Sequence, residues 1–297
     1  MFKKNKNLYA DLSLLLVALI WGSGFVATKH ALNTITPYYM MTFRFTIACL
    51  LMAIVFYKRL KSAKFQDFKA GTVIGLFLFV AFAAQTVGLQ YTTAGKQAFL
   101  TGTNVVIVPF LYWIVKKNRP DKYNLTAAFL CFCGIGLLTL SESLSINLGD
   151  LLTLVCAFFF ACHIVSIGYF AEHHDPIVLT IVQLGISAVL SFAASLLLET
   201  APQNVPTDTI LAVLYLGVFS TLVAFLIQNV AQKYTTPTHA AIILSLESVF
   251  GTILSTILLK ELFTVKMFFG CVIIFVAILT AETKWEFLKM KKVRENS

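Results

Sequence analysis

Long apolar stretches alternate with short polar segments along nearly the whole chain. A helix needs roughly 20 apolar residues to cross about 30 Å of hydrocarbon, and ten stretches approach or reach that length. They run approximately over residues 12–32, 38–57, 70–90, 97–116, 124–141, 150–170, 177–198, 209–232, 239–259 and 265–283. Runs such as Leu12–Ile20 lack the period-two alternation of a transmembrane β-strand. The pattern therefore predicts spanning α-helices.

The first stretch also has features of a secretory signal peptide, because Lys3, Lys4 and Lys6 precede the apolar run Leu12–Ile20. The run continues through Trp21-Gly22-Ser23-Gly24 into further apolar sequence. No small-x-small cleavage site follows the apolar core. We therefore expect an uncleaved first transmembrane helix.

The composition agrees with this pattern. Of 297 residues 58% are apolar and only 12% are charged, with a mean hydropathy of +0.83. A soluble domain is about half apolar and one-quarter charged, and no segment here is polar enough to cover one. The predicted fold class is an all-α polytopic membrane protein.

Basic residues predict the orientation. The N-terminal tail, alternate loops and the C-terminal tail hold 18 of the 23 Lys and Arg residues, and such segments stay cytoplasmic. Both termini are therefore expected in the cytoplasm, and the protein in the cytoplasmic membrane of a bacterium. The net charge of +9 follows from this bias. Because no basic folded module is present, phospholipid headgroups rather than nucleic acid are the expected counter-charge.

The two halves of the chain resemble each other. Residues 11–53 correspond to 150–192 at an offset of 139, and residues 80–117 correspond to 223–260 at an offset of 143. Matched positions include Asp11/Asp150, Pro37/Pro176, Gln85/Gln228 and Tyr91-Thr92-Thr93/Tyr234-Thr235-Thr236. Chance identities between apolar helices are the alternative explanation, but the shared Y-T-T turn argues for duplication. The predicted units are residues 1–146, residues 147–284 and a basic tail, 285–297.

Each of the two repeats, 1–146 and 147–284, contains five predicted helices. An odd number of helices places the two ends of a repeat on opposite sides of the membrane. The second repeat must therefore be inverted relative to the first. Inverted repeats are typical of secondary transporters, in which the substrate binds between the repeats and access alternates between the two sides. The predicted architecture is ten transmembrane helices as two inverted five-helix repeats.

Several motifs carry a resemblance to a known family. Ile20-Trp21-Gly22-Ser23-Gly24-Phe25 resembles the W-G-S-x-F signature of EamA-type permeases of the drug/metabolite transporter superfamily. Arg44-Phe45, the segment Tyr91–Thr101, and Leu246-Glu247 with Lys260-Glu261-Leu262-Phe263-Thr264 resemble further parts of its pattern. Ser248 stands where that pattern has Pro, so a straighter helix is expected there. The resemblance implies a ten-helix carrier of small organic metabolites, commonly an exporter or exchanger.

Two ionisable residues lie deep in predicted helices, where a charge is expensive and marks a functional hypothesis. Arg44 is suited to an anionic substrate group such as a carboxylate. Glu247 is suited to an ammonium group or a coupling proton. The structural alternative for both is a buried hydrogen bond that holds helices together.

Polar residues in other helices extend this candidate site. Gln97, Thr101 and Asn104 stand at i, i+4 and i+7 and so share one helix face, and the repeat offset aligns Asn104 with Glu247. Further candidates are the repeat pair Gln85 and Gln228, Trp21 as a stacking surface with Ser23 near it, and His163, because the ordinary pKa of a histidine lies near neutral pH. Helix packing is the alternative for each of them.

The leading functional hypothesis is a secondary transporter that moves a small organic metabolite, such as an amino acid, by alternating access. A passive channel and a membrane scaffold or receptor are the alternatives. No H-E-x-x-H, nucleophile elbow or P-loop is present, so neither an enzyme nor an ATP-driven pump is expected. No cofactor or metal is expected, and His173-His174-Asp175 is interpreted as a solvated turn. Expected partners are the substrate, the bilayer and a coupling proton or counter-substrate.

Overall fold

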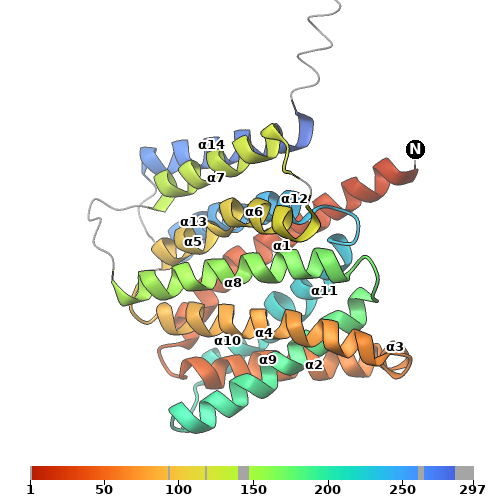
Figure 1. Ribbon diagram of the computed structural model, residues 1–297. Coiled ribbons are helices and arrows are strands. Elements are labelled where there is room, and N and C mark those ends of the chain that lie inside the picture. Colours follow the sequence, from red (N-terminus) through yellow and green to blue (C-terminus); the bar gives the residue numbers. More distant parts are fainter. Residues whose placement is uncertain (1, 93, 118, 140–146, 260–263, 285–297) are drawn as a thin grey trace, which may run out of the picture.

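The chain folds as a bundle of helices in the computed structural model, which describes residues 2–92, 94–117, 119–139, 147–259 and 264–284 (Figure 1). These residues contain helices and no β-strand. The helices are α1 (Phe2–Ala31), α2 (Pro37–Val55), α3 (Tyr57–Lys61), α4 (Phe65–Gly88), α5 (Ala94–Gly102), α6 (Asn104–Lys116), α7 (Lys122–Thr139), α8 (Leu148–Phe170), α9 (Pro176–Leu198), α10 (Thr207–Tyr215), the π-helix η1 (Leu216–Val223), α11 (Ala224–Ala231), α12 (Pro237–Leu244), α13 (Leu246–Leu259) and α14 (Val265–Thr283).

Among the described residues, seven helical segments have the length and apolar composition needed to cross a membrane. Three shorter apolar helices, 100–116, 122–137 and 268–281, fall within the remaining predicted stretches. The helical fold class is confirmed, and the count of ten spanning helices stays a prediction. Residues 1–146 contribute α1–α7, and α8–α14 follow in the second predicted unit.

Three predicted helices are interrupted. The stretch 97–116 is divided between α5 and α6, and the stretch 209–232 contains the π-helix η1 between α10 and α11. The stretch 239–259 is divided at Ser245, so the straight helix expected from Ser248 is wrong. Ser245 Oγ donates 2.6 Å to the Ile242 carbonyl, a contact that bends helices.

Local sequence explains where several helices begin. Pro37, Pro176 and Pro237 occupy first-turn positions of α2, α9 and α12, where no backbone N–H is needed. The α8 helix starts with a capping box, in which Asn147 Oδ1 accepts from the Asp150 N–H at 3.0 Å and Asp150 Oδ2 accepts from the Asn147 N–H at 2.9 Å. These signals place the turns between successive helices.

Helices from the two halves pack directly against each other. In Figure 1, α7 and α14 lie together at one edge of the bundle, with α2 and α9 at the opposite edge. Between these pairs, α1 packs against α13 and α11, while α8 packs against α4, α5 and α6. The centre of the bundle is therefore an interface between the first and second halves of the chain.

Glycines permit the closest helix contacts. A Cβ added to Gly22 would lie 2.7 Å from the Gly251 backbone nitrogen, where α1 meets α13. On α7, a Cβ added to Gly134 would lie 2.9 Å from the Gly270 carbonyl of α14. Such contacts let helix backbones approach each other, as at the interfaces of membrane helices.

The outside of the bundle is apolar. Large side chains such as Ile54 and Leu197 are 73% and 82% exposed. A surface of this kind is unfavourable in water and favourable in hydrocarbon. Together with the apolar helices, it identifies a multi-pass membrane protein.

Candidate functional site

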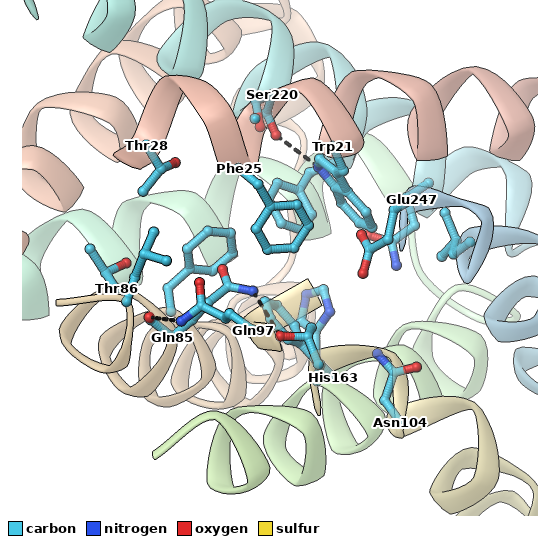
Figure 2. Close-up of a pocket in the computed structure, with 18 of the residues that line it drawn as sticks. Trp21, Phe25, Thr28, Gln85, Thr86, Gln97, Asn104, His163, Ser220 and Glu247 are labelled. Atoms are coloured by element: carbon cyan, nitrogen blue, oxygen red, sulfur yellow. Dashed lines mark hydrogen bonds between the residues drawn. The ribbon is translucent and has the colours of Figure 1, made fainter. Parts of the chain in front are cut away.

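A cavity lies at the centre of the bundle, between the two halves of the chain (Figure 2). Trp21 and Phe25 lie along one edge, and the Glu247 carboxylate and the Asn104 amide lie beside the same space. Nine of the ten predicted binding residues line this cavity. They are Trp21, Arg44, Gln85, Gln97, Thr101, Asn104, His163, Gln228 and Glu247.

Ser23 is the predicted residue that does not line the cavity. Its hydroxyl is hydrogen-bonded to the Tyr215 hydroxyl of α10 and donates 2.7 Å to the Ile20 carbonyl. The neighbouring Gly24 lines the cavity instead. Ser23 therefore connects α1 to α10 outside the site.

Arg44 brings a positive charge to the cavity. Its side chain is buried, with 3% of its surface exposed, and its guanidinium lies 4.6 Å from the centre of the Phe82 ring. Nε donates 2.9 Å to Thr221 Oγ1 and Nη2 donates 3.4 Å to Ser220 Oγ. No carboxylate among the described residues forms an ion pair with Arg44. Hydroxyls and a ring face hold this guanidinium without neutralising it.

The π-helix positions the partners of Arg44. Ser220 and Thr221 both belong to η1, and the Ser220 carbonyl accepts a 2.9 Å hydrogen bond from Trp21 Nε1. A π-turn widens the helix and often occurs at functional sites. The indole of α1, the guanidinium of α2 and the widened turn thus form one connected part of the wall.

Glu247 brings a carboxyl group to the cavity. It stands in the first turn of α13, where the helix dipole favours an anion, and its side chain is 8% exposed. Its carboxylate has no hydrogen bond or ion pair within the described part of the chain. The close contact between Gly22 and Gly251 holds this turn against α1, near Trp21.

A small polar network occupies the first half of the wall. Gln97 Nε2 donates 2.6 Å to the Gln85 carbonyl, and Gln85 Nε2 donates 3.4 Å to Thr101 Oγ1. The break between α5 and α6 separates Thr101 from Asn104, yet both still face the cavity. The predicted polar face therefore survives the interruption of its helix.

His163 and Gln228 are both buried but differ in their hydrogen bonding. His163 Nε2 donates 2.8 Å to Gln183 Oε1, and its ring packs edge-on against Phe225 at 5.7 Å between centroids. Gln228 is fully buried on α11, and neither polar atom of its amide has a hydrogen-bond partner among the described residues. His163 is therefore anchored, whereas Gln228 is free to bind.

Aromatic side chains missing from the predicted set form much of the wall. Phe82 packs against Phe160 at 5.3 Å and against Phe225 at 6.0 Å between centroids, and Trp21 lies 5.2 Å from Phe225. The internal repeat contained a signal for them, because Phe82 and Phe225 are 143 residues apart within the matched Val-Ala-Phe segments.

The repeat offsets relate many lining residues to one another. Seven pairs of cavity residues are separated by 139 or 143 positions. They are Trp21/Phe160, Gly24/His163, Phe25/Ile164, Phe82/Phe225, Gln85/Gln228, Thr101/Leu244 and Asn104/Glu247. Equivalent positions of the two halves thus face one cavity, with the same residue in two pairs and different residues in the other five.

Other polar residues lie away from the cavity. Lys29 donates 3.0 Å to the Leu89 carbonyl and 3.4 Å to the Thr92 carbonyl, so it caps the end of α4. His174 Nδ1 lies 2.6 Å from Asp67 Oδ1, and Asp175 accepts from Arg59 at 2.8 Å. The described residues contain no group of three or more His, Cys, Asp or Glu side chains that could hold a metal ion.

Comparisons with known proteins agree with this architecture. The chain is 40% identical over 92% of its length to an "Uncharacterized transporter" of Archaeoglobus fulgidus, of which it covers 86%. It is 28% identical to the "Probable amino-acid metabolite efflux pump" of Escherichia coli, with 88% of this chain and 90% of that protein covered. One solved protein structure superposes with a TM-score of 0.80 at 17% identity, covering 94% of this chain and 98% of that one, and so shares the fold.

The sequence also matches the EamA-like transporter family twice, over residues 8–140 and 147–282. These two matches together cover most of the chain. The protein belongs to the EamA-like transporter family, within the drug/metabolite transporter superfamily.

Proposed function

We propose that this protein is a secondary transporter that exports or exchanges a small organic metabolite carrying both an anionic and a cationic group, such as an amino acid. The observation that carries the proposal is the central cavity with its two charges. Arg44 and Glu247 line the same space, and neither has a countercharge within the described residues. A zwitterion neutralises both at once, with its carboxylate at Arg44 and its ammonium at Glu247. The efflux-pump name of the Escherichia coli relative supports this substrate class.

The proposal includes two inverted repeats of five spanning helices, in residues 1–146 and 147–284, with 285–297 as a tail. The seven repeat-related pairs in the cavity wall support this arrangement. Contacts between turns support the alternation of sides. Arg59 contacts Asp175 and Lys116 contacts Glu172 at one end of the bundle, whereas His30 contacts Asp208 and Thr34 contacts Thr209 at the other. Each contact joins turns that the basic-residue pattern places on one side.

We assign the end with Arg59 and Lys116, and both termini, to the cytoplasmic side of a bacterial cytoplasmic membrane, because most Lys and Arg residues belong to this side. The opposite end then faces outward. In this orientation the cavity lies between an outer end and an inner end, and the repeat offsets relate residues at one end to residues at the other.

Alternating access needs two ends that open in turn, and the two ends differ here. At the glycine crossing, where Gly88 of α4 meets Gly149 of α8, a Cβ on Gly149 would lie 2.6 Å from the Gly88 carbonyl oxygen. The repeat offsets relate Gly88 to Ala231 and Gly149 to Ala10. At this alanine crossing a groove lies between α1 and α11, lined by Ala10 and Ala231. This difference between matched crossings supports a state closed at the outer end.

Solute exchange in proteoliposomes tests the function. Purified full-length protein is reconstituted into liposomes preloaded with unlabelled amino acids, and uptake of the labelled compounds is followed. We expect counterflow that depends on the internal amino acid. Steady conductance without counterflow would instead identify a channel, and no movement of any solute would leave a scaffold.

A further inference from the structure

We propose that Gln228 determines substrate specificity by pairing with a carboxamide. The transported metabolite would then carry an amide group in addition to its ammonium group. This inference rests on the proposed function, because it names a further chemical group of the same substrate. Gln228 lies in the wall of the central cavity on α11.

The amide of Gln228 is buried without any partner. Its side chain has 0% exposure, and within the part of the chain that the structure describes both Nε2 and Oε1 lack a hydrogen bond. Buried polar groups are nearly always paired, since an unpaired one loses its hydration without compensation. An unpaired donor and an unpaired acceptor on one cavity side chain indicate a ligand that supplies both complements.

Comparison with the other repeat explains why this amide is unpaired. In Gln85, the counterpart of Gln228, the side-chain Nε2 donates 3.4 Å to Thr101 Oγ1. The counterpart of Thr101 is Leu244, 143 residues later, and its side chain cannot form a hydrogen bond. The second repeat has kept the glutamine and lost this internal partner.

The neighbouring lining residues limit the charge of the ligand. In the first repeat, neutral Asn104 stands at the position that Glu247 occupies in the second. Gln97 Oε1 is also unpaired, and it only accepts hydrogen bonds. Glu247 and Gln97 thus present acceptors that suit an ammonium group, and this leaves Gln228 for a second, neutral group.

The chemistry of the Gln228 amide selects that neutral group. A carboxamide has an N–H beside a carbonyl oxygen, so it can satisfy Oε1 and Nε2 together. A carboxylate has acceptors only, and one of its oxygens would face Gln228 Oε1. A thioether or alkyl chain would leave both atoms unpaired. Sites built to hydrogen-bond one substrate group discriminate strongly against analogues that lack it.

The experiment compares three amino acids of similar length in the proteoliposome counterflow assay. L-glutamine carries the carboxamide, L-glutamate replaces it with a carboxylate, and L-methionine replaces it with a thioether. We expect half-maximal counterflow at a concentration about tenfold lower for L-glutamine than for either analogue. An analogue that leaves one buried amide unpaired should lose about 5- to 150-fold in affinity.

The variant Gln228→Met tests the residue, because methionine has nearly the same shape and no amide. We expect the preference for L-glutamine over L-methionine to fall to about threefold or less. Gln66→Leu is the matched control, since Gln66 is exposed at the start of α4. This variant should prefer L-glutamine over L-methionine as strongly as the wild type does. Thermal unfolding in detergent checks that Gln228→Met is folded.

Two results would overturn the inference. One is a wild-type protein that exchanges L-methionine as readily as L-glutamine, which would leave the transporter assignment intact. The other is an unchanged preference in folded Gln228→Met. If none of the amino acids is exchanged, the proposed function itself fails, and this outcome is distinct from both.

Discussion

Thr92 Oγ1 donates a 2.9 Å hydrogen bond to Asp150 Oδ1 and so ties the end of α4 to the start of α8. Both residues are buried, and Asp150 also accepts from the Asn147 N–H in the cap of α8. The bond lies next to the glycine crossing of Gly88 and Gly149. This end of the cavity, which we propose is closed, is therefore held by a polar contact and by close backbone packing.

Thr92→Val should weaken this closed end. Valine keeps the shape but removes the donor to a buried carboxylate, so we expect a loss of about 1.5–3 kcal/mol in stability. Thermal unfolding in detergent measures the change. Thr126→Val is the matched control, because the Thr126 hydroxyl bonds only within its own helix at an exposed site. Equal midpoints for the two variants would contradict the role of Thr92.

Gly149→Ala should open the glycine crossing. The new methyl group would lie 2.6 Å from the Gly88 carbonyl oxygen and 2.9 Å from the Tyr91 carbonyl carbon, both backbone atoms that cannot move alone. Overpacking of this kind costs about 1–3 kcal/mol, and we expect at least a tenfold slower exchange rate in proteoliposomes.

Gly185→Ala provides the control for the glycine crossing. Its Cβ would meet only Cys49 Sγ at 3.3 Å, a side-chain atom that can shift slightly. The prediction fails if Gly149→Ala exchanges substrate at the rate of Gly185→Ala.

Arg44→Lys should impair substrate binding although the charge is kept. A lysine ammonium cannot reproduce both the Thr221 and Ser220 contacts and the flat packing over Phe82. We expect half-maximal counterflow to require about tenfold more substrate. Arg59→Lys at the exposed pair with Asp175 is the control, and a similar effect in both variants would argue against a cavity role.

Glu247→Gln should reduce exchange of substrates with an ammonium group by about tenfold or more. The change keeps the size of the side chain and removes the only acidic charge among the lining residues. The control is Glu172→Gln, since Glu172 pairs with Lys116 at the surface. Binding of amino acids that is unaffected in Glu247→Gln would remove Glu247 from the site.

Acid should loosen the attachment between α7 and α14. Asp121 is partly buried, which raises the pKa of its carboxyl, but hydrogen bonds from Lys284 and the Asn124 N–H lower this pKa by more. A lowered pKa in the folded state gives stability that is present at neutral pH. That stability is lost as pH falls below about 4. Between pH 7 and pH 3.5 the unfolding midpoint should fall more for the wild type than for Asp121→Asn, and parallel curves would contradict this.

Much of the architecture could be predicted from the sequence because the membrane imposes a simple rule on apolar length. The interruptions within the helices could not be predicted in this way. The segment Leu216–Val223 has no proline to mark the π-helix, and the break at Ser245 coincides with a contact to Ile242 that hydropathy does not report. A break of this kind depends on local hydrogen bonding rather than on composition.

The candidate site was predictable to the extent that polar residues in hydrocarbon must face protein or water. Nine predicted residues meet in one cavity on this basis. Ser23 fails because one step along a helix turns a side chain by about 100°, and its hydroxyl has a partner in Tyr215 that no local pattern reveals. Phe82 and Phe225 were overlooked because an apolar residue facing a cavity resembles one facing lipid.

The contacts of α2 with α9 and of α7 with α14 join each helix to its own repeat counterpart. Such self-complementary contacts are the defining feature of a twofold dimer, here contained in one polypeptide. In the proposed inverted arrangement, these contacts would join the two halves without a covalent link between them. Residues 1–140 and 147–297, synthesised from two separate genes, would then have the surfaces they need to reassemble as partners in one membrane.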